Sequence, residues 1–243
     1  MPTTAKKVKQ RAPRNRTIEL NPGEIERLRA SLVFAENSVG SIETRNAVIC
    51  GDTFYILDRL PSARFDLLFA DPPYNLTKDF GAEKFNRRSS DAYEAWLDSW
   101  LKLCVRLLTP TASVYVCGDW RSSAAIQRVG SRYFKLQNRI TWEREKGRGA
   151  KANWKNSSED IYFCTASKDY TFNLDAVKVA RRVIAPYTDS QGAPKDWVRT
   201  ATGGERLTHP SNLWNIVLPA NQCASELSSD AANDASLRAN RPA

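Results

Sequence analysis

Histidine is almost absent from the sequence, because His209 is the only one among 243 residues. Histidine-based metal sites and catalytic triads therefore have very little material to work with. The five cysteines are spread along the chain with no close pair, a pattern that predicts neither a zinc knuckle nor a disulfide framework. An odd number of cysteines is typical of a reducing compartment. We therefore expect no metal site, and we expect any chemistry to come from carboxylates, backbone carbonyls and aromatic side chains.

Long apolar runs are also missing. No stretch approaches the roughly 20 apolar residues that a membrane-spanning helix needs, and the N-terminus has no apolar segment of the signal-peptide kind. Hydrophobic residues make up 42% of the chain and charged residues 26%, which is typical of a globular protein in water. We expect a cytoplasmic protein with one large domain, or with a core and a small accessory region.

Acidic residues are outnumbered by basic ones, 27 against 36, which gives a formal net charge of +9. Such a charge favours an anionic partner through phosphate contacts, although charge that only keeps the protein in solution explains the composition equally well. Residues 1–16 contain no acidic residue and carry Lys6, Lys7, Lys9, Arg11, Arg14 and Arg16. For residues 1–40 we expect a nucleic-acid-binding arm and a short helix that begins with Asn21 as cap and Pro22 in its first turn. A merely solvated tail is the alternative.

Segments with strand and helix periodicity alternate after this arm. Strands are predicted at residues 47–50, 65–70, 112–117, 136–142 and 160–164. The clearest helix runs from Ser90 to Leu108, and Thr109-Pro110 ends it. This alternation predicts a largely parallel α/β sheet, whose ligands bind beyond the carboxyl ends of the strands. Gly51-Asp52, Asp71 to Tyr74 and Gly118-Asp119 are expected at those ends.

The segment Asp71-Pro72-Pro73-Tyr74 directly follows the second predicted strand. The Asp71 carboxylate and the Pro72 carbonyl both accept hydrogen bonds, and proline adds no competing N–H donor. Two such acceptors suit the exocyclic amino group of a base, because its lone pair must be drawn out of the ring and back onto nitrogen. The prolines stiffen the segment, and Tyr74 offers a flat face to a base that has rotated out of a duplex. A rigid turn after a buried strand is the alternative reading.

These residues and their surroundings resemble the permuted, or beta, group of DNA amino-methyltransferases, which modify adenine N6 or cytosine N4. The similarity covers about residues 45–214. It includes Gly51-Asp52-Thr53, Phe65 to Leu76, Asn138 to Trp142, Ser158 to Phe163, Tyr170 to Val177 and His209 to Trp214. The resemblance implies a Rossmann-like S-adenosylmethionine methyltransferase sheet with helices on both faces, and a catalytic region over residues 41–175.

The same resemblance implies roles for individual residues. Asp71, Pro72, Pro73 and Tyr74 would form the catalytic site, and S-adenosyl-L-methionine would be the cofactor. Asp52 and Thr53 would lie near its adenosine part, while Asp71 and Pro72 would also contact its methionine end. A plain helix cap is the alternative for Asp52. Asp119 is in a similar cap position, and we assign no role to it.

Double-stranded DNA is the partner that the resemblance implies. The candidate DNA-binding residues are Arg144, Lys146, Arg148 and Lys151, which lie in a basic loop near Trp142 and Trp154, and Arg181 and Arg182. The two latter arginines fall in residues 176–214, where the family places target recognition. A solvated charged loop is the alternative for the first group. Base-edge recognition depends on side-chain direction, so the target sequence is not predicted.

The sequence departs from the family pattern after Trp214. A strand that ends in a Phe-x-Gly-x-Gly-like loop is expected there and does not appear, and residues 215–243 have a composition typical of disorder. We therefore expect a sheet that is incomplete at the C-terminus and binds the cofactor weakly, unless a homodimer or a second polypeptide supplies the segment.

The functional expectation is methyl transfer to adenine N6 of DNA, in a restriction-modification or regulatory context. Cytosine N4 methylation and a catalytically dead DNA-binding remnant are the alternatives. We expect a bacterial cytoplasmic protein that associates with the nucleoid through DNA.

Overall fold

The computed structural model describes residues 20–37, 44–79, 84–144, 152, 154–183, 187–201 and 203–215. The predicted arm over residues 1–16 and the C-terminal segment after residue 215 lie outside the described residues. The chain divides into two compact bodies between Pro61 and Ser62. The predicted domain ranges place boundaries elsewhere, and they stay predictions.

The first body begins with helix α1 (Pro22–Ala30). Asn21 caps this helix as predicted, because its side chain accepts a hydrogen bond from the Glu24 backbone N–H while the Glu24 side chain accepts one from the Asn21 N–H. Ser31 ends the helix, and strand β1 (Leu32–Phe34) begins directly after it. Strand β1 pairs in parallel with β2 (Val48–Cys50), which confirms the strand predicted at residues 47–50. The short 3-10 helix η1 (Ala35–Asn37) follows β1, and helix α2 (Thr53–Arg59) follows β2.

A five-stranded sheet in the order β12-β7-β8-β6-β3 forms the centre of the second body. Its strands are β3 (Phe65–Ala70), β6 (Leu108–Gly118), β7 (Lys135–Glu143), β8 (Ser158–Thr165) and β12 (Leu213–Trp214). Strand β8 runs antiparallel to both neighbours, whereas the other four strands share one direction. The sheet is therefore mixed, with two parallel and two antiparallel strand pairs, and not the largely parallel sheet that was predicted. The predicted α/β fold class is confirmed.

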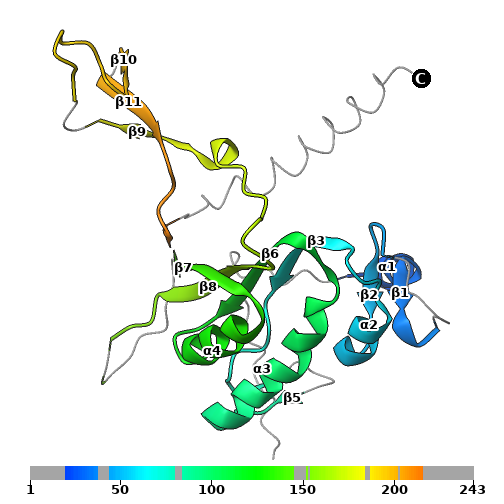
Figure 1. Cartoon of the computed structure of the whole chain (residues 1–243). Helices are drawn as coiled ribbons and strands as arrows, with labels where there is room; N and C mark the ends of the chain where they lie inside the picture. Colours follow the sequence, from blue (N-terminus) through cyan, green and yellow to red (C-terminus); the bar gives the residue numbers. More distant parts are fainter. Residues whose placement is uncertain are drawn as a thin grey trace, which may run out of the picture. The chain divides into compact units, whose positions relative to one another are not determined.

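Helices α3 (Ser90–Val105) and α4 (Ser123–Tyr133) pack side by side, and α4 also contacts β6, β7 and β8 (Figure 1). Val114 and Val116 of β6 face these helices and are almost fully buried. Because side chains alternate along a strand, Tyr115 and Cys117 face the other side of the sheet. There Cys117 joins a cluster with Ile140, Ile161 and Phe163, against which Tyr74, Tyr115, Tyr170 and Trp214 pack.

Smaller elements complete the second body. Strands β4 (Lys78–Asp79) and β5 (Lys84–Phe85) form an antiparallel pair, and η2 (Asp175–Val177) is a short 3-10 helix. Strands β9 (Val179–Arg182), β10 (Val198–Thr200) and β11 (Gly203–Thr208) form a separate antiparallel sheet in the order β10-β11-β9. None of the helices in the described part of the chain is long and apolar enough to cross a membrane.

Candidate active site

The segment Asp71 to Tyr74 begins where β3 ends. Because β3 pairs in parallel with β6, the carboxyl ends of both strands lie at the same end of the sheet. Asp71, which follows β3, therefore lies at the same end as Asp119, which follows β6. The Asp71 side chain is exposed, Pro72 is buried, and Pro73 and Tyr74 are half-buried. The structure therefore presents one carboxylate to solvent beside a rigid and partly buried proline pair.

Two neighbouring elements hold this segment in place. The Tyr93 hydroxyl of α3 donates a hydrogen bond to the Pro73 carbonyl over 3.0 Å. The Asn75 side chain donates to the Arg88 carbonyl over 2.9 Å and accepts from the Arg88 N–H over 2.8 Å. Among the residues that the structure describes, none donates a hydrogen bond to the Pro72 carbonyl. The Pro72 carbonyl therefore has no hydrogen-bond donor among the described residues, although Pro72 itself is buried, while the Pro73 carbonyl anchors the segment.

Tyr74 bonds through its hydroxyl to a second carboxylate. The hydroxyl donates to Oε2 of Glu159 over 3.3 Å. Burial raises the pKa of Tyr74 well above its ordinary value, and the negative charges of Glu159 and Asp71 add to this effect. The phenol therefore stays protonated and remains a donor, while the ring packs against the cluster around Cys117.

Cys117 is the thiol nearest to this chemistry, but it is unsuited to nucleophilic attack. Burial raises the pKa of Cys117 to about 11, with smaller contributions from the charges of Asp71 and Glu159. A thiol must lose its proton to become a strong nucleophile. The site therefore offers hydrogen-bond acceptors and an aromatic face, and it does not offer a thiolate at neutral pH.

Asp119 holds the turn that leads from β6 into α4, whereas Ser122 occupies the N-cap position of the helix. The Asp119 carboxylate accepts hydrogen bonds from the backbone N–H groups of Arg121 and Ser122 and from the Ser122 hydroxyl. Burial raises the pKa of Tyr93, and the negative charge of Asp119 raises it further. The Tyr93 hydroxyl therefore stays protonated and remains a donor to the Pro73 carbonyl.

The two residues expected at the adenosine part of the cofactor lie in the first body. Asp52 caps α2, because its Oδ1 accepts a hydrogen bond from the Tyr55 N–H over 3.1 Å. Thr53 is the first residue of the same helix, and both residues are exposed. The cap is real, and the role of the two residues in cofactor binding stays a prediction.

The predicted DNA-binding loop is described only in part. Lys146, Arg148 and Lys151 lie outside the described residues, whereas Arg144 directly follows β7. The Arg144 guanidinium forms an ion pair with Oε1 of Glu159, so a DNA phosphate would have to share or replace this partner. Trp154 is 95% exposed and available for stacking.

Arg181 and Arg182 lie on opposite faces of the three-stranded sheet. Arg181 is paired with Arg206 of β11, and Arg182 is paired with Glu205. Directly opposed residues in antiparallel strands point to the same face, and neighbours in one strand point to opposite faces. Arg181 and Arg206 therefore share a face, and Arg182 and Glu205 share the other.

Arg199 belongs to the face of Arg181. It is paired with Gly204, the neighbour of Glu205, and its guanidinium lies 5.8 Å from the centre of the Trp197 ring. Trp197 packs against Gly204 so closely that a Cβ there would come within 2.7 Å of the ring. We call the face formed by Arg181, Arg199 and Arg206 the arginine face, since one arginine comes from each strand.

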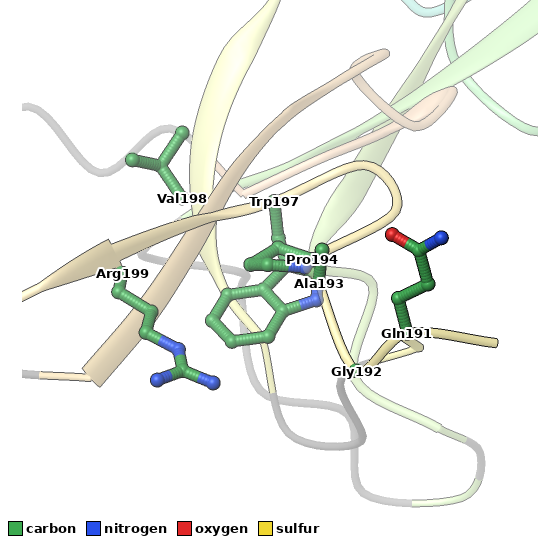
Figure 2. A pocket seen from close by; sticks show the side chains of 7 residues that line it. All are labelled: Gln191, Gly192, Ala193, Pro194, Trp197, Val198 and Arg199. Carbon is green, nitrogen blue, oxygen red and sulfur yellow. The ribbon is translucent and has the colours of Figure 1, made fainter. Parts of the chain in front are cut away.

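A shallow pocket opens beside this sheet (Figure 2). Its lining consists of Gln191, Gly192, Ala193, Pro194, Trp197, Val198 and Arg199, and its volume is about 590 Å³. The Trp197 indole N–H donates to the Tyr187 carbonyl over 2.7 Å, which fixes the ring at the pocket wall. None of the residues from Asp71 to Tyr74 lines this pocket, so it is a separate feature.

Sequence reasoning missed three residues of the active site. Tyr93 was assigned to the core stripe of a helix, and its hydroxyl was overlooked. Asn75 and Glu159 were noted only as part of wider matches. Each is revealed by a contact across 13 to 85 residues of sequence, which the local pattern does not encode.

The chain is similar in sequence to known DNA methylases. The family described as "DNA methylase" (N6_N4_Mtase) matches residues 65–226. Type II methyltransferase M.HpaI of Haemophilus parainfluenzae is 28% identical over 174 residues, which cover 70% of this chain and 50% of that protein. DNA adenine methyltransferase YhdJ of Escherichia coli (strain K12) is 30% identical over 174 residues, with 70% and 56% covered. The chain thus spans about half the length of the curated relatives it matches.

Solved structures show weaker similarity. PvuII DNA methyltransferase, described as cytosine-N4-specific, has a TM-score of 0.45 at 15% identity, with 53% of this chain and 52% of that chain covered. A Thermus thermophilus protein described as "Putative DNA Modification Methylase", in complex with S-adenosyl-L-methionine, has a TM-score of 0.40 at 21% identity, with 52% and 56% covered.

Proposed function

The chain belongs to the DNA methylase family, and on that premise we propose that it carries the base-binding site of an enzyme that methylates adenine N6 in double-stranded DNA. The observation that carries the proposal is the pair formed by the exposed Asp71 carboxylate and the Pro72 carbonyl, which has no donor among the described residues, on an anchored segment beside Tyr74. The names of the relatives include an adenine enzyme and a cytosine-N4 enzyme. Adenine is our choice because aspartate is the first residue of the segment.

The residues fit S-adenosyl-L-methionine as methyl donor. When bound, it supplies a methyl group on a positively charged sulfur. Asp71 is an exposed carboxylate at the carboxyl end of a strand, a favourable position for a ligand with a cationic centre. Asp71 and Pro72 would hold the donor's methionine end.

The chain's own residues prepare the base for the reaction. Asp71 accepts one amino hydrogen and Pro72 accepts the other, which draws the lone pair onto nitrogen. With S-adenosyl-L-methionine bound, the nitrogen would accept the methyl group from sulfur, and the exposed Asp71 carboxylate would pass the proton that the amino group loses to water. Tyr74 stacks on the base, and Tyr93 and Asn75 keep the acceptors in position without reorganisation.

The arginine face would contact the DNA backbone through Arg181 and Arg199. Its three arginines provide positive charge from three strands, and Trp197 provides an aromatic surface. Lys146, Arg148 and Lys151 are proposed as further phosphate contacts.

Nucleoside analysis tests the proposed activity. The purified chain is incubated with unmethylated DNA and with labelled S-adenosyl-L-methionine at a concentration high enough to offset the weak cofactor binding that the sequence predicts. The DNA is then digested and analysed by mass spectrometry. We expect N6-methyladenine, and we expect its loss in Asp71→Asn but not in Asp91→Asn, an exposed aspartate in the first turn of α3. N4-methylcytosine in its place would show that the base is cytosine. DNA binding without transfer would favour a binding remnant and refute the enzyme.

A further inference from the structure

Glu159 lies between the tyrosine of the active site and an arginine that was predicted to bind DNA. Its Oε2 accepts the hydrogen bond from the Tyr74 hydroxyl, and its Oε1 forms the ion pair with Arg144. The Glu159 side chain is only 14% exposed, whereas the Arg144 side chain is 52% exposed. Both carboxylate oxygens are therefore occupied, and solvent screens the pair less than it would on an open surface.

The sheet fixes this arrangement. Glu159 is the second residue of β8 and is paired with Trp142 of β7. The Arg144 N–H donates to the Ser157 carbonyl, which extends the β7–β8 ladder by one step beyond the strands. Tyr74 arrives from β3, two strands away from β8 in the sheet order. Three segments far apart in sequence therefore meet at Glu159 because of strand register.

Glu159 is poorly suited to accept the amino hydrogens of a base. Oε2 already has the Tyr74 hydroxyl as donor, and Oε1 has the Arg144 guanidinium. Asp71 is exposed, and its charge and hydrogen bonding also raise the pKa of the Tyr74 hydroxyl. The two carboxylates therefore have different tasks, and the charge of Glu159 is balanced within the protein.

We propose that Glu159 is a positioning residue that holds the Tyr74 ring in its base-stacking orientation, and that Arg144 acts chiefly as the counter-ion of Glu159 and not as a phosphate contact. This inference rests on the proposed function, since it assigns to Tyr74 the role of stacking platform. A tyrosine ring turns about two side-chain bonds. A hydrogen bond at the hydroxyl limits rotation about the first bond, which sets where the ring lies, and packing against the cluster around Cys117 limits rotation of the ring about its own axis. Removal of either Glu159 or Arg144 therefore disturbs Tyr74 without removing an acceptor for the base.

Fluorine NMR detects the contact between Tyr74 and Glu159 and does not depend on methyl-transfer activity. The full chain is labelled with 3-fluorotyrosine, and the Tyr74 resonance is identified by its loss in Tyr74→Phe. We expect Glu159→Ala and Arg144→Ala to shift this resonance. Glu159→Gln should shift it less, because it keeps an acceptor oxygen. Glu143→Ala, which removes an exposed carboxylate from the neighbouring strand, should leave it unchanged. An unchanged resonance in Glu159→Ala overturns the inference.

Binding and transfer measurements separate positioning from phosphate contact. We expect Arg144→Ala to keep the dissociation constant for duplex DNA within about twofold and to lower the transfer rate about fivefold, as Glu159→Ala does, with partial recovery in Glu159→Gln. Weaker DNA binding by Arg144→Ala with an unchanged Tyr74 resonance would identify a phosphate contact and overturn the inference. If the unaltered chain transfers no methyl group, the proposed function fails, while the fluorine shifts still decide whether Glu159 and Arg144 hold Tyr74.

Discussion

Replacing Arg181 and Arg182 one at a time tests which face of the three-stranded sheet contacts DNA. The two residues are neighbours in β9 and both are exposed, so their replacement by alanine removes the same charge from nearly the same place. Arg181 belongs to the arginine face, whereas Arg182 shares the opposite face with Glu205. If the arginine face contacts the backbone, Arg181→Ala weakens DNA binding and Arg182→Ala acts as its matched control.

The expected magnitude follows from counterion release. Each neutralised phosphate contributes about −0.9 to the slope of log K against log salt concentration. Arg181→Ala should therefore make the slope less steep by about 0.9, and the Arg181→Ala/Arg199→Ala double variant by about 1.8. A contact of this kind accounts for about a 3.5-fold change in affinity between about 50 and 200 mM salt. Arg206 is a weaker candidate, because it forms an ion pair with Asp196 at 3.3 Å.

Fluorescence anisotropy of a labelled duplex over a salt series measures these slopes. We expect the slope of Arg182→Ala to match that of the unaltered chain, and we expect circular dichroism to show the same fold for all variants. Equal changes in slope for Arg181→Ala and Arg182→Ala would refute the reasoning, because one sheet face cannot present both side chains. A larger change for Arg182→Ala would place the DNA on the opposite face.

Three further predictions concern the active site and its support. Tyr93→Phe removes the donor to the Pro73 carbonyl and should cost about 1 kcal/mol in the free energy of unfolding, measured in urea, and lower the transfer rate severalfold; an unchanged rate would show that Pro73 needs no anchor. Burial raises the pKa of Cys117 to about 11, so the thiol stays protonated and the transfer rate should show no inflection from it between pH 7 and 9. The free energy of unfolding should fall as the pH rises towards 11, because the folded state resists ionisation of the thiol. The hydrogen bonds from Arg132 and Tyr133 lower the pKa of Asp98. The ionised Asp98 therefore stabilises the fold above the ordinary carboxyl pKa, and this stabilisation is lost as the pH falls. Asp98→Asn should lower the melting temperature at pH 7 and make no difference in strong acid.

The sequence was informative where local patterns decide the structure. The cap at Asn21, the strands at residues 65–70 and 112–117, and the helix that begins at Ser90 all follow from residue spacing and from capping chemistry. The chemistry expected of Asp71 to Tyr74 also came from local features, since it depends on the residue types themselves.

The directions of side chains and their contacts between strands depend on strand register, which the sequence did not specify. Arg181 and Arg182 were grouped as one basic site, and their opposite directions became visible only when β9 was paired with β11. Glu159 belonged to a predicted strand, but its contacts with Tyr74 and Arg144 depend on the order of three strands. Such contacts are non-local, and a single sequence without a partner for each strand does not specify them.

Replacing a residue that accepts hydrogen bonds from the base should lower the transfer rate more than replacing a residue that only anchors the site. In the proposed mechanism Asp71 acts on the reacting amino group itself, and removal of one group that stabilises the developing charge typically costs about 100- to 1,000-fold in rate. Tyr93 and Glu159 each bond to a residue that would lie next to the base, and Asn75 anchors the same segment to Arg88. Loss of one such bond, about 1 kcal/mol, corresponds to roughly fivefold. Because Tyr93 holds Pro73 and Glu159 holds Tyr74 through separate contacts, the two losses should multiply in the Tyr93→Phe/Glu159→Ala double variant. The product would still fall short of the loss in Asp71→Asn. If either anchor variant alone matched Asp71→Asn, its side chain would have to act on the base directly, and the assignment of Asp71 as the principal acceptor would be wrong.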